Sequence, residues 1–146
     1  LDPDDVAPWF NRGLSHTRTR NSAAAIDDFT KAIELTPDDP AAFVQRGYAL
    51  YERRECERAV ADFTRAVELR PESGRAYFGR ALAHRRGGDI QAALADATAV
   101  LERNAQSDSA YNLRGSLRHQ AGDFAGALDD HLQALELDPD DAATLN

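Results

Sequence analysis

Four histidines and one cysteine are the side chains of this sequence that could bind a transition metal or act as nucleophiles. They are His16, His84, His119, His131 and Cys56. No histidine has a second His or a Cys four positions away, the spacing that puts two ligands on one helical face. The cysteine stands between Glu55 and Glu57, and adjacent carboxylates disfavour its reactive thiolate form. The chain also lacks a phosphate-binding glycine loop and a Gly-x-Ser-x-Gly turn. We therefore expect no metal, no cofactor and no catalytic residues.

A second set of residues offers chemistry of a different kind, because arginines and aspartates recur at a constant separation. Each arginine is followed sixteen positions later by an aspartate, in the pairs Arg12 and Asp28, Arg46 and Asp62, Arg80 and Asp96, and Arg114 and Asp130. A guanidinium can donate two parallel hydrogen bonds to one carboxylate. Residues that recur in every unit of a repeat usually serve the packing of that unit, so we interpret these residues as four structural pairs. A ligand-binding row of arginines is the less favoured alternative.

The elements that would bring each pair together belong to a repeated unit. Residues 6–39, 40–73, 74–107 and 108–141 align without a gap, each unit beginning 34 residues after the last. Each unit opens with a helical pattern that starts on an aromatic residue and closes with a helical pattern rich in alanine. Gly88-Asp89 and Gly122-Asp123 predict a break followed by an N-cap, and Asp39-Pro40 predicts an N-cap followed by proline. Each unit is therefore predicted to be a helix–turn–helix in which the Arg and Asp positions face each other.

One known family has this pattern. The motif Trp9-x2-Arg12-Gly13-x2-His16, followed by Ala25-x3-Phe29 and by Pro37, resembles the tetratricopeptide repeat. The resemblance covers nearly the whole chain and implies an all-α fold, a right-handed α-solenoid of tandem antiparallel helix pairs. The third unit departs from the family pattern, with Ala81, Ala97 and Ala105 where the family prefers Gly, a large aromatic and Pro.

The two ends of the chain resemble each other. Residues 1–5 repeat residues 137–141 letter for letter, and residues 142–146 fit the opening of a further unit. We therefore interpret residues 1–5 as the end of a preceding repeat and residues 142–146 as the start of a fifth. The expectation is a single domain over residues 1–146, taken from a longer array, with no polar cap over its terminal apolar faces.

The resemblance also implies where a partner would bind. In tetratricopeptide arrays, unit positions 2, 5, 9 and 12 share one face of the first helix and line a concave groove. The residues that we assign to this partner-binding groove, including the position next to the stripe, are Phe10, Leu14, Arg18, Val44, Tyr48, Tyr51, Arg75, Phe78, Leu82, Arg85, Arg86, Asn112 and His119. Tyr, Phe and Arg are favoured interface anchors. The alternative for Phe10, Phe78 and Leu82 is that they pack between neighbouring first helices.

The distribution of charge indicates the chemistry of the partner. The chain has a net charge of −8, yet its third unit carries five basic residues against three acidic ones. A basic and aromatic groove in an acidic protein predicts an extended or helical peptide with acidic and apolar side chains. The chaperone-tail clamp of the family is not expected. At its Lys, Asn and Arg positions this chain has Phe10, Leu14, Gln45, Arg75 and Gly79, of which only Arg75 is basic.

Composition excludes other classes of protein. The negative net charge lacks the basic footprint of a nucleic-acid-binding protein, and no run of 18 apolar residues predicts a membrane span. A single cysteine excludes an internal disulfide and fits a reducing compartment, which favours the cytoplasm. We predict a protein-interaction scaffold and not an enzyme. Two alternatives stay open: a self-assembly module that forms homo-oligomers through uncapped repeat ends, and a regulatory or recruiting arm of a larger multidomain enzyme.

Overall fold

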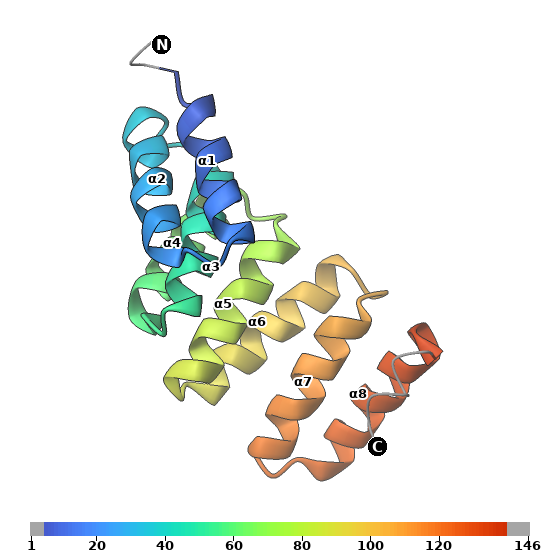
Figure 1. Cartoon of the computed structure of the whole chain (residues 1–146). Coiled ribbons are helices and arrows are strands. Elements are labelled where there is room, and N and C mark those ends of the chain that lie inside the picture. The colour runs from blue at the N-terminus through green and yellow to red at the C-terminus, as the bar shows by residue number, and fades with distance from the viewer. Residues whose placement is uncertain (1–4, 140–146) are drawn as a thin grey trace.

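A computed structural model describes residues 5–139, which form eight α-helices and no strand (Figure 1). The helices are α1 (Ala7–Arg18), α2 (Ser22–Leu35), α3 (Pro40–Glu52), α4 (Cys56–Leu69), α5 (Gly74–Gly87), α6 (Ile90–Arg103), α7 (Asp108–Gln120) and α8 (Phe124–Leu137). They form four pairs in chain order, and the predicted all-α class is confirmed. The expected pieces of a preceding and a fifth repeat fall almost entirely on residues 1–4 and 140–146, which lie outside the described range.

Aspartate side chains begin three of the helices where the sequence predicts it. Asp39 accepts a hydrogen bond from the backbone N–H of Ala41 at 2.9 Å, and Pro40 takes the first position of α3. Asp89 and Asp123 accept equivalent bonds at the starts of α6 and α8, at 3.0 and 2.9 Å. Each bond satisfies one of the backbone donors that a helix leaves free at its start. The predicted starts of these helices are confirmed.

The turn inside each unit contains one residue in the left-handed backbone conformation. Gly88 and Gly122 supply it in the third and fourth units, with φ of +90° and +85°. The first and second units use Arg20 and Arg54, with φ of +56° and +64°. A side chain with a Cβ pays about 1–2 kcal/mol for this conformation, which glycine adopts freely. The first two turns are therefore locally strained.

Successive pairs pack against one another to form a continuous solenoid (Figure 1). Each helix contacts the next along the chain, and α3 also contacts α1 and α5 directly. The second helices α2, α4 and α6 make no comparable contact with one another. The first helices α1, α3 and α5 are thus closer together than the second helices, and the first helices form the inner, concave wall.

Close approach of the helices depends on glycines that face aromatic rings. A Cβ added at Gly13 would come within 2.7 Å of the ring of Phe29. The ring of Phe63 lies against two glycines, Gly47 of its own unit and Gly79 of the next. Both phenylalanines have 0% exposure. The glycine and aromatic positions of the repeat therefore form a single packing motif.

The third unit fills the same space with different residues. Ala81 and Ala97 stand where the second unit has Gly47 and Phe63, and both alanines are fully buried. They form one apolar cluster with Leu113 and Leu117 of the fourth unit. The leucines supply bulk that the absent ring would have provided. Leu113 and Leu117 of the fourth unit therefore compensate for the small residues Ala81 and Ala97 of the third.

Arginine–aspartate pairs bridge the two helices of every unit. Each arginine donates from Nε and Nη2 to the two carboxylate oxygens at 2.6–2.9 Å, in the pairs Arg12–Asp28, Arg46–Asp62, Arg80–Asp96 and Arg114–Asp130. The same guanidinium also lies against the aromatic residue that opens the first helix of its unit. The distance from the guanidinium carbon to the centroid of the aromatic ring is 4.9–5.8 Å. The hydrogen bonds to the carboxylates raise the pKa of Arg80 and Arg114 above the ordinary value, so these arginines hold their charge.

A further donor of the arginine links neighbouring units. Nη1 of Arg46 donates to Oγ1 of Thr30 at 3.0 Å, and Nη1 of Arg80 donates to Oγ1 of Thr64 at 3.2 Å. Both threonines belong to the preceding unit. The position that these threonines occupy in the first two units holds Thr98 in α6 of the third unit and Leu132 in α8 of the fourth.

We expect Arg46→Ala to lower the free energy of unfolding by about 1–4 kcal/mol, because it leaves the carboxylate of Asp62 buried without its partner. The side chains of Arg46 and Asp62 are 18% and 8% exposed. The matched control is Arg65→Ala, since the side chains of Arg65 and its partner Glu68 are 44% and 58% exposed and water can replace the lost contact. Urea unfolding measures both variants. Equal losses for the two substitutions would show that burial of the pair contributes nothing.

We expect Gly79→Ala to destabilise the protein by about 1–3 kcal/mol, because the added methyl would overlap the ring of Phe63. Alanine is the better helix former by about 1 kcal/mol, and the overlap must exceed that gain. Gly87→Ala is the matched control, since a Cβ there meets only the Cβ of Cys56 at 3.7 Å. That variant should be neutral or more stable in the same urea titration. A stabilised Gly79→Ala would contradict the packing described above.

Candidate functional site

Two tyrosine–arginine contacts cross the boundary between α3 and α5 on the inner wall. The ring of Tyr48 is half-buried and meets the ring of Phe63 edge-on, with centroids 5.0 Å apart. The Tyr48 hydroxyl donates to the backbone carbonyl of Arg75 at 3.2 Å, and the Arg75 guanidinium lies 5.4 Å from the Tyr48 ring centroid. Burial raises the pKa of Tyr48 above its ordinary value, and the charge of Arg75 opposes this in part. Tyr48 therefore also holds the second and third units together.

The second contact is closer. The guanidinium carbon of Arg86 lies 3.6 Å from the ring centroid of Tyr51, and Arg86 Nη1 donates to the Tyr51 carbonyl oxygen at 2.6 Å. Arg86 itself is exposed. A ligand in this part of the groove would meet a fixed guanidinium stacked on an aromatic ring, and not a bare tyrosine.

A hollow of about 330 Å³ lies between α5 and α7. It is lined by Phe78, Leu82, Arg85, Asp108, Ser109, Asn112, Leu113 and Ser116. Four predicted groove residues thus come together here: Phe78, Leu82, Arg85 and Asn112. The lining combines apolar surface with a cation, an anion and neutral hydrogen-bonding groups. Such a lining can hold an apolar side chain of a peptide and bind its polar neighbours.

The remaining predicted groove residues are more scattered. Phe10 meets the buried ring of Phe29 edge-on at 5.6 Å, and Leu14 is half-buried against the same apolar cluster. Arg18 is exposed at the end of α1. His119 is exposed at the other end of the solenoid, near the end of α7, with its ring 5.2 Å from that of Phe124. None of these four joins the contacts between α3 and α5 described above.

Val44 is not part of the groove surface, and this prediction is wrong. Its side chain is 6% exposed and lies in the same core cluster as Phe43 and Leu50. The physical reason is that α3 is contacted by first helices on both sides, α1 and α5, as well as by its neighbours α2 and α4. A stripe residue on such a helix is covered by its neighbours.

A second hollow, which the sequence did not predict, lies beside Tyr48. It has a volume of about 630 Å³ and is lined by Thr17, Arg20, Ser22, Tyr48, Ala49 and Glu52. Arg20 and Glu52 are the charged residues that sequence reasoning missed. The signal for Arg20 was the turn Thr19-Arg20-Asn21, which places a long side chain where the third and fourth units have glycine. The two charges are opposite, so this hollow favours neither anionic nor cationic ligands.

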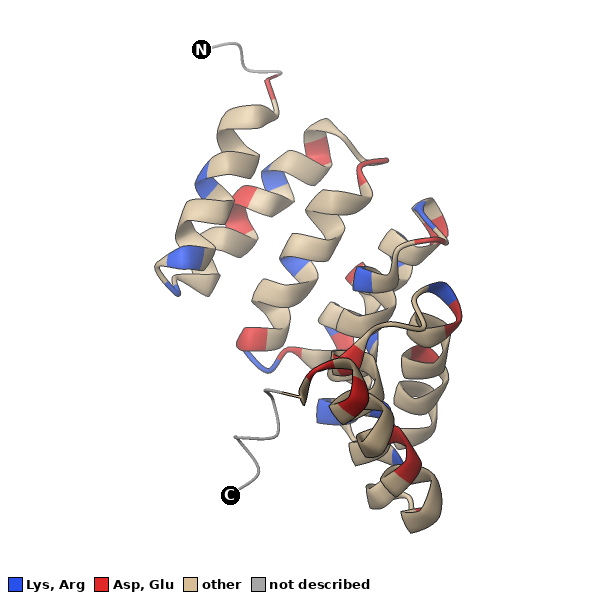
Figure 2. Cartoon of the chain, turned by 90° about the vertical axis from the view of Figure 1, so that its right-hand side faces the viewer, with Lys and Arg blue, Asp and Glu red and all other residues tan. Residues whose placement is uncertain are grey.

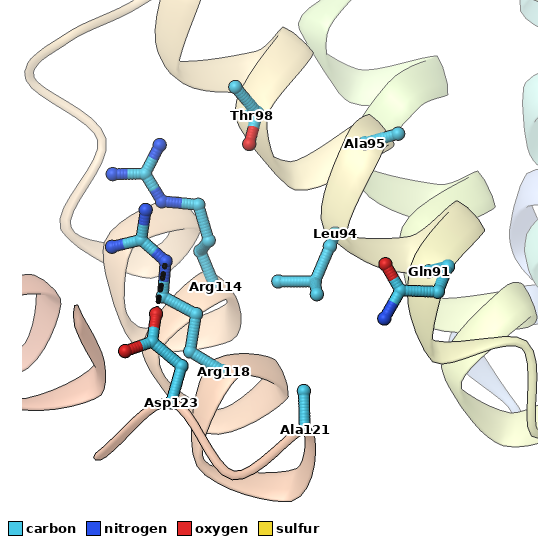
Figure 3. Close-up of a pocket in the computed structure, with 8 residues that line it drawn as sticks. All are labelled: Gln91, Leu94, Ala95, Thr98, Arg114, Arg118, Ala121 and Asp123. Atoms are coloured by element: carbon cyan, nitrogen blue, oxygen red, sulfur yellow. Dashed lines mark ion pairs between the residues drawn. The ribbon is translucent and has the colours of Figure 1, made fainter. Parts of the chain in front are cut away.

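A pocket of about 440 Å³ lies between α6 and α7, and Figure 3 shows the residues that line it. Arg114 and Arg118 lie next to each other here, an arrangement that would attract an anion. Both arginines, however, donate to the carboxylate of Asp130, and Arg118 also lies 3.8 Å from Asp123. The positive charge is balanced within the protein. This pocket is therefore not a candidate anion site.

Three of the four histidines occupy structural positions. His16 and His84 lie 3.8 and 3.9 Å from the carboxylates of Asp28 and Asp96, and the ring of His131 lies over Gly115. Residues 5–139 contain no group of three or more His, Cys, Asp or Glu that could hold a metal ion. Over the same range, every helix is too short or too polar to cross a lipid bilayer.

Comparison with known families agrees with this architecture. The tetratricopeptide repeat family matches residues 6–39, 44–97 and 80–142, which together make up most of the sequence. The chain belongs to the tetratricopeptide repeat family. No curated protein matches this tetratricopeptide chain.

Solved structures resemble the tetratricopeptide chain over nearly its whole length. MamA from residue 41 to its end, from Desulfovibrio magneticus RS-1, has a TM-score of 0.88 at 17% identity, covering 98% of this chain and 79% of that one. YrrB, described as a tetratricopeptide protein with an unusual peptide-binding site, has a TM-score of 0.84 at 22% identity, covering 95% and 72%. The first tetratricopeptide domain of Spaghetti (RPAP3), solved with the HSP90 peptide SRMEEVD, has a TM-score of 0.79 at 22% identity, covering 84% and 97%. These likenesses support the solenoid fold.

We expect Tyr48 to ionise at a higher pH than a tyrosine in water, because its burial disfavours the phenolate. The chain has four tyrosines, whose ionisation can be followed by ultraviolet absorbance during an alkaline titration. The step at the highest pH should disappear in Tyr48→Phe. The controls are Tyr111→Phe and a parallel far-ultraviolet circular dichroism record that shows the fold intact. If the highest step survives in Tyr48→Phe, the hydroxyl is more exposed than described.

Proposed function

We propose that this tetratricopeptide chain is a protein-interaction scaffold that binds a peptide segment on its inner wall, between α3 and α7. The observation that carries the proposal is the set of basic and aromatic residues on neighbouring first helices. Tyr48 and Tyr51 on α3 adjoin Arg75 and Arg86 on α5, and Arg85 lines the hollow that follows. YrrB is described as having a peptide-binding site, and the domain of Spaghetti (RPAP3) was solved with a bound peptide, which supports the general mode of binding.

The partner that suits this wall is a peptide with acidic and apolar side chains. Apolar side chains fit the hollow that Phe78 and Leu82 help to line, while carboxylates approach the arginines. Arg75 is exposed and stands in contact with Tyr48. A guanidinium held against an aromatic ring has already lost much of its conformational freedom, so less entropy is lost when a carboxylate binds it. The net charge of the whole chain is −8, which confines attraction for acidic ligands to this region.

Recognition of a chaperone tail through its terminal carboxylate is not part of the proposal. The family's clamp positions hold Phe10, Leu14, Gln45, Arg75 and Gly79 here, of which only Arg75 is basic. Gly79 also has no room for a side chain, since an added Cβ would come within 2.4 Å of the ring of Phe63. We therefore propose recognition of an internal segment, in which acidic side chains and not a chain end provide the charge.

We expect the double variant Arg75→Glu plus Arg85→Glu to weaken binding of an acidic-apolar peptide by about tenfold or more. Each surface contact between opposite charges is worth roughly 0.5–1 kcal/mol, and reversal replaces attraction with repulsion. The probe is a fluorescein-labelled peptide in which Asp or Glu alternates with Leu or Phe, titrated by fluorescence anisotropy at two salt concentrations. Binding to the unaltered chain should weaken as salt rises.

A matched control separates local from overall charge. Arg65→Glu plus Arg70→Glu changes the net charge by the same amount at exposed positions on α4 and just after it, outside the inner wall. It should leave the affinity within about twofold of the unaltered chain, because screening limits the reach of surface charges to roughly 10 Å. Similar losses in both double variants would mean that net charge alone attracts the peptide, and the groove proposal would fail.

A further inference from the structure

The hollow beside Tyr48 lies between the first and second units of the solenoid. Thr17 and Arg20 line it from α1 and the turn that follows, while Tyr48, Ala49 and Glu52 line it from α3. We call it the α1–α3 hollow. Its volume of about 630 Å³ is larger than that of the hollow between α5 and α7, which is about 330 Å³. It is therefore large enough to hold one or two side chains of a ligand.

At the boundary between the second and third units, the equivalent positions carry two side chains that pack on each other. Tyr51 stands 34 residues after Thr17, and Arg86 stands 34 residues after Glu52. The Arg86 guanidinium carbon lies 3.6 Å from the Tyr51 ring centroid, and Arg86 Nη1 donates to the Tyr51 carbonyl oxygen at 2.6 Å. Thr17 is too short to supply such a ring, and Glu52 has the opposite charge. The α1–α3 hollow is therefore the same place without its aromatic ring and without its guanidinium.

Two opposite charges line the α1–α3 hollow without neutralising each other. Arg20 and Glu52 are exposed, and neither side chain forms an ion pair or a hydrogen bond with any other residue of the range 5–139. By contrast, Arg53 and Arg58 both donate to Glu55 in the turn between α3 and α4. Figure 2 shows blue at the turn that follows α1 and red at the end of α3, at the same end of these two helices. A ligand that carries both charges would pair with both residues.

The backbone beside the hollow offers an acceptor to the same ligand. The carbonyl oxygen of Thr17 accepts from the backbone N–H of Arg20 at 3.1 Å, and that of Tyr51 accepts from the equivalent N–H at 3.0 Å. The Tyr51 oxygen receives its second bond from Arg86, whereas the Thr17 oxygen has no side-chain donor within the described chain. A carbonyl oxygen has two lone pairs. A guanidinium in the hollow could therefore donate to this oxygen and to the carboxylate of Glu52 together.

Ligands with a single kind of charge fit the hollow less well. A lone cation would be attracted to Glu52 but repelled by Arg20, and a lone anion would meet the reverse. An apolar side chain would remove water from both charged groups without replacing it. An arginine beside an acidic residue supplies one partner to each charge. The pair of opposite charges thus selects a pair of opposite charges.

We propose that the α1–α3 hollow binds an arginine and a neighbouring aspartate or glutamate of the peptide that the inner wall binds. The guanidinium of the peptide donates to Glu52 and to the Thr17 carbonyl oxygen, and the carboxylate pairs with Arg20. Acidic residues already belong to the proposed ligand, so the new element is a single arginine at one end of the segment. This inference rests on the proposed function, because the same segment continues along the wall to α5 and α7.

The probe is the labelled acidic–apolar peptide with Arg-Asp added through a spacer of glycine and serine. Neighbouring helices pack about 8–10 Å apart and an extended residue spans about 3.3 Å, so about six spacer residues connect the two hollows. One version carries the addition at its amino end and another at its carboxyl end. Each has a twin with citrulline, which keeps the shape of arginine and lacks its charge. In at least one version the arginine peptide should bind about fivefold more tightly than its citrulline twin, as measured by fluorescence anisotropy.

Two substitutions in the protein assign this preference to the hollow. Glu52→Gln should reduce the arginine preference to about onefold while leaving the affinity for the citrulline peptide within about twofold. Arg20→Gly should make binding insensitive to replacement of the added Asp by Asn. This variant should fold at least as well as the unaltered chain, because Gly88 and Gly122 hold the same turn position with positive φ. Asp27→Asn removes one charge from an exposed position of α2 and is the matched control, which should retain the preference.

The outcomes separate this inference from the proposed function. If the acidic–apolar peptide binds but neither arginine version exceeds its citrulline twin, only the inference about the α1–α3 hollow is overturned. A preference that survives Glu52→Gln, or that Asp27→Asn also removes, overturns it as well, because the arginine would then be bound elsewhere or by net charge. Absence of binding by every peptide would overturn the proposed function and this inference with it.

Discussion

The contact of small residues with aromatic or leucine side chains controls how closely each helix pair approaches the next. Phe63 illustrates this contact, since its ring lies between Gly47 and Gly79 and thereby joins the second unit to the third. A helix pair of this size cannot bury enough apolar surface on its own, and stacking supplies the deficit. The inner wall and its hollows follow from this arrangement, since each is a surface that stacking creates.

The arginine–aspartate pairs have a different structural role from the apolar contacts. Each pair fixes one helix against its partner inside a unit, and each buried carboxylate receives two hydrogen bonds from one guanidinium. Such a pair contributes direction as well as attraction, because the planar guanidinium accepts few geometries. With the tilt of each pair fixed in this way, the exposed residues on the inner wall are free to differ between units. Tyr48, Arg75 and Arg85 occupy such positions, and they carry the proposed recognition.

Much of the fold could be predicted from the sequence because the residues that specify each structural element occur four times, once in each unit. The helix starts at Pro40, Ile90 and Phe124 were predictable, since Asp39, Asp89 and Asp123 are strong local signals. The meeting of Arg and Asp in each unit followed from their constant separation. These features depend on spacing within one unit, which a sequence records directly.

The candidate site was less predictable because it depends on contacts between units. Val44 and Tyr48 both lie on the predicted stripe, yet only Tyr48 reaches the surface. The stacking of Arg86 on Tyr51 depends on the distance between α3 and α5, which no pattern within either helix contains. The threonine contacts of Arg46 and Arg80 were missed for the same reason. Position on a helical face can be read from a sequence, whereas coverage by a neighbour cannot.

The threonine contacts have a consequence for the cooperativity of the chain. Stability of a repeat protein is approximately the sum of unit terms and nearest-neighbour interface terms. Arg46–Thr30 and Arg80–Thr64 strengthen the first two interfaces, and among the described residues the third has no equivalent hydrogen bond. The fourth unit is therefore the most weakly coupled, and sub-global opening should begin with it while the first three units remain folded. The hollow between α5 and α7 lies at that boundary, so its two walls belong to the pair of units that side-chain hydrogen bonds constrain least among the described residues.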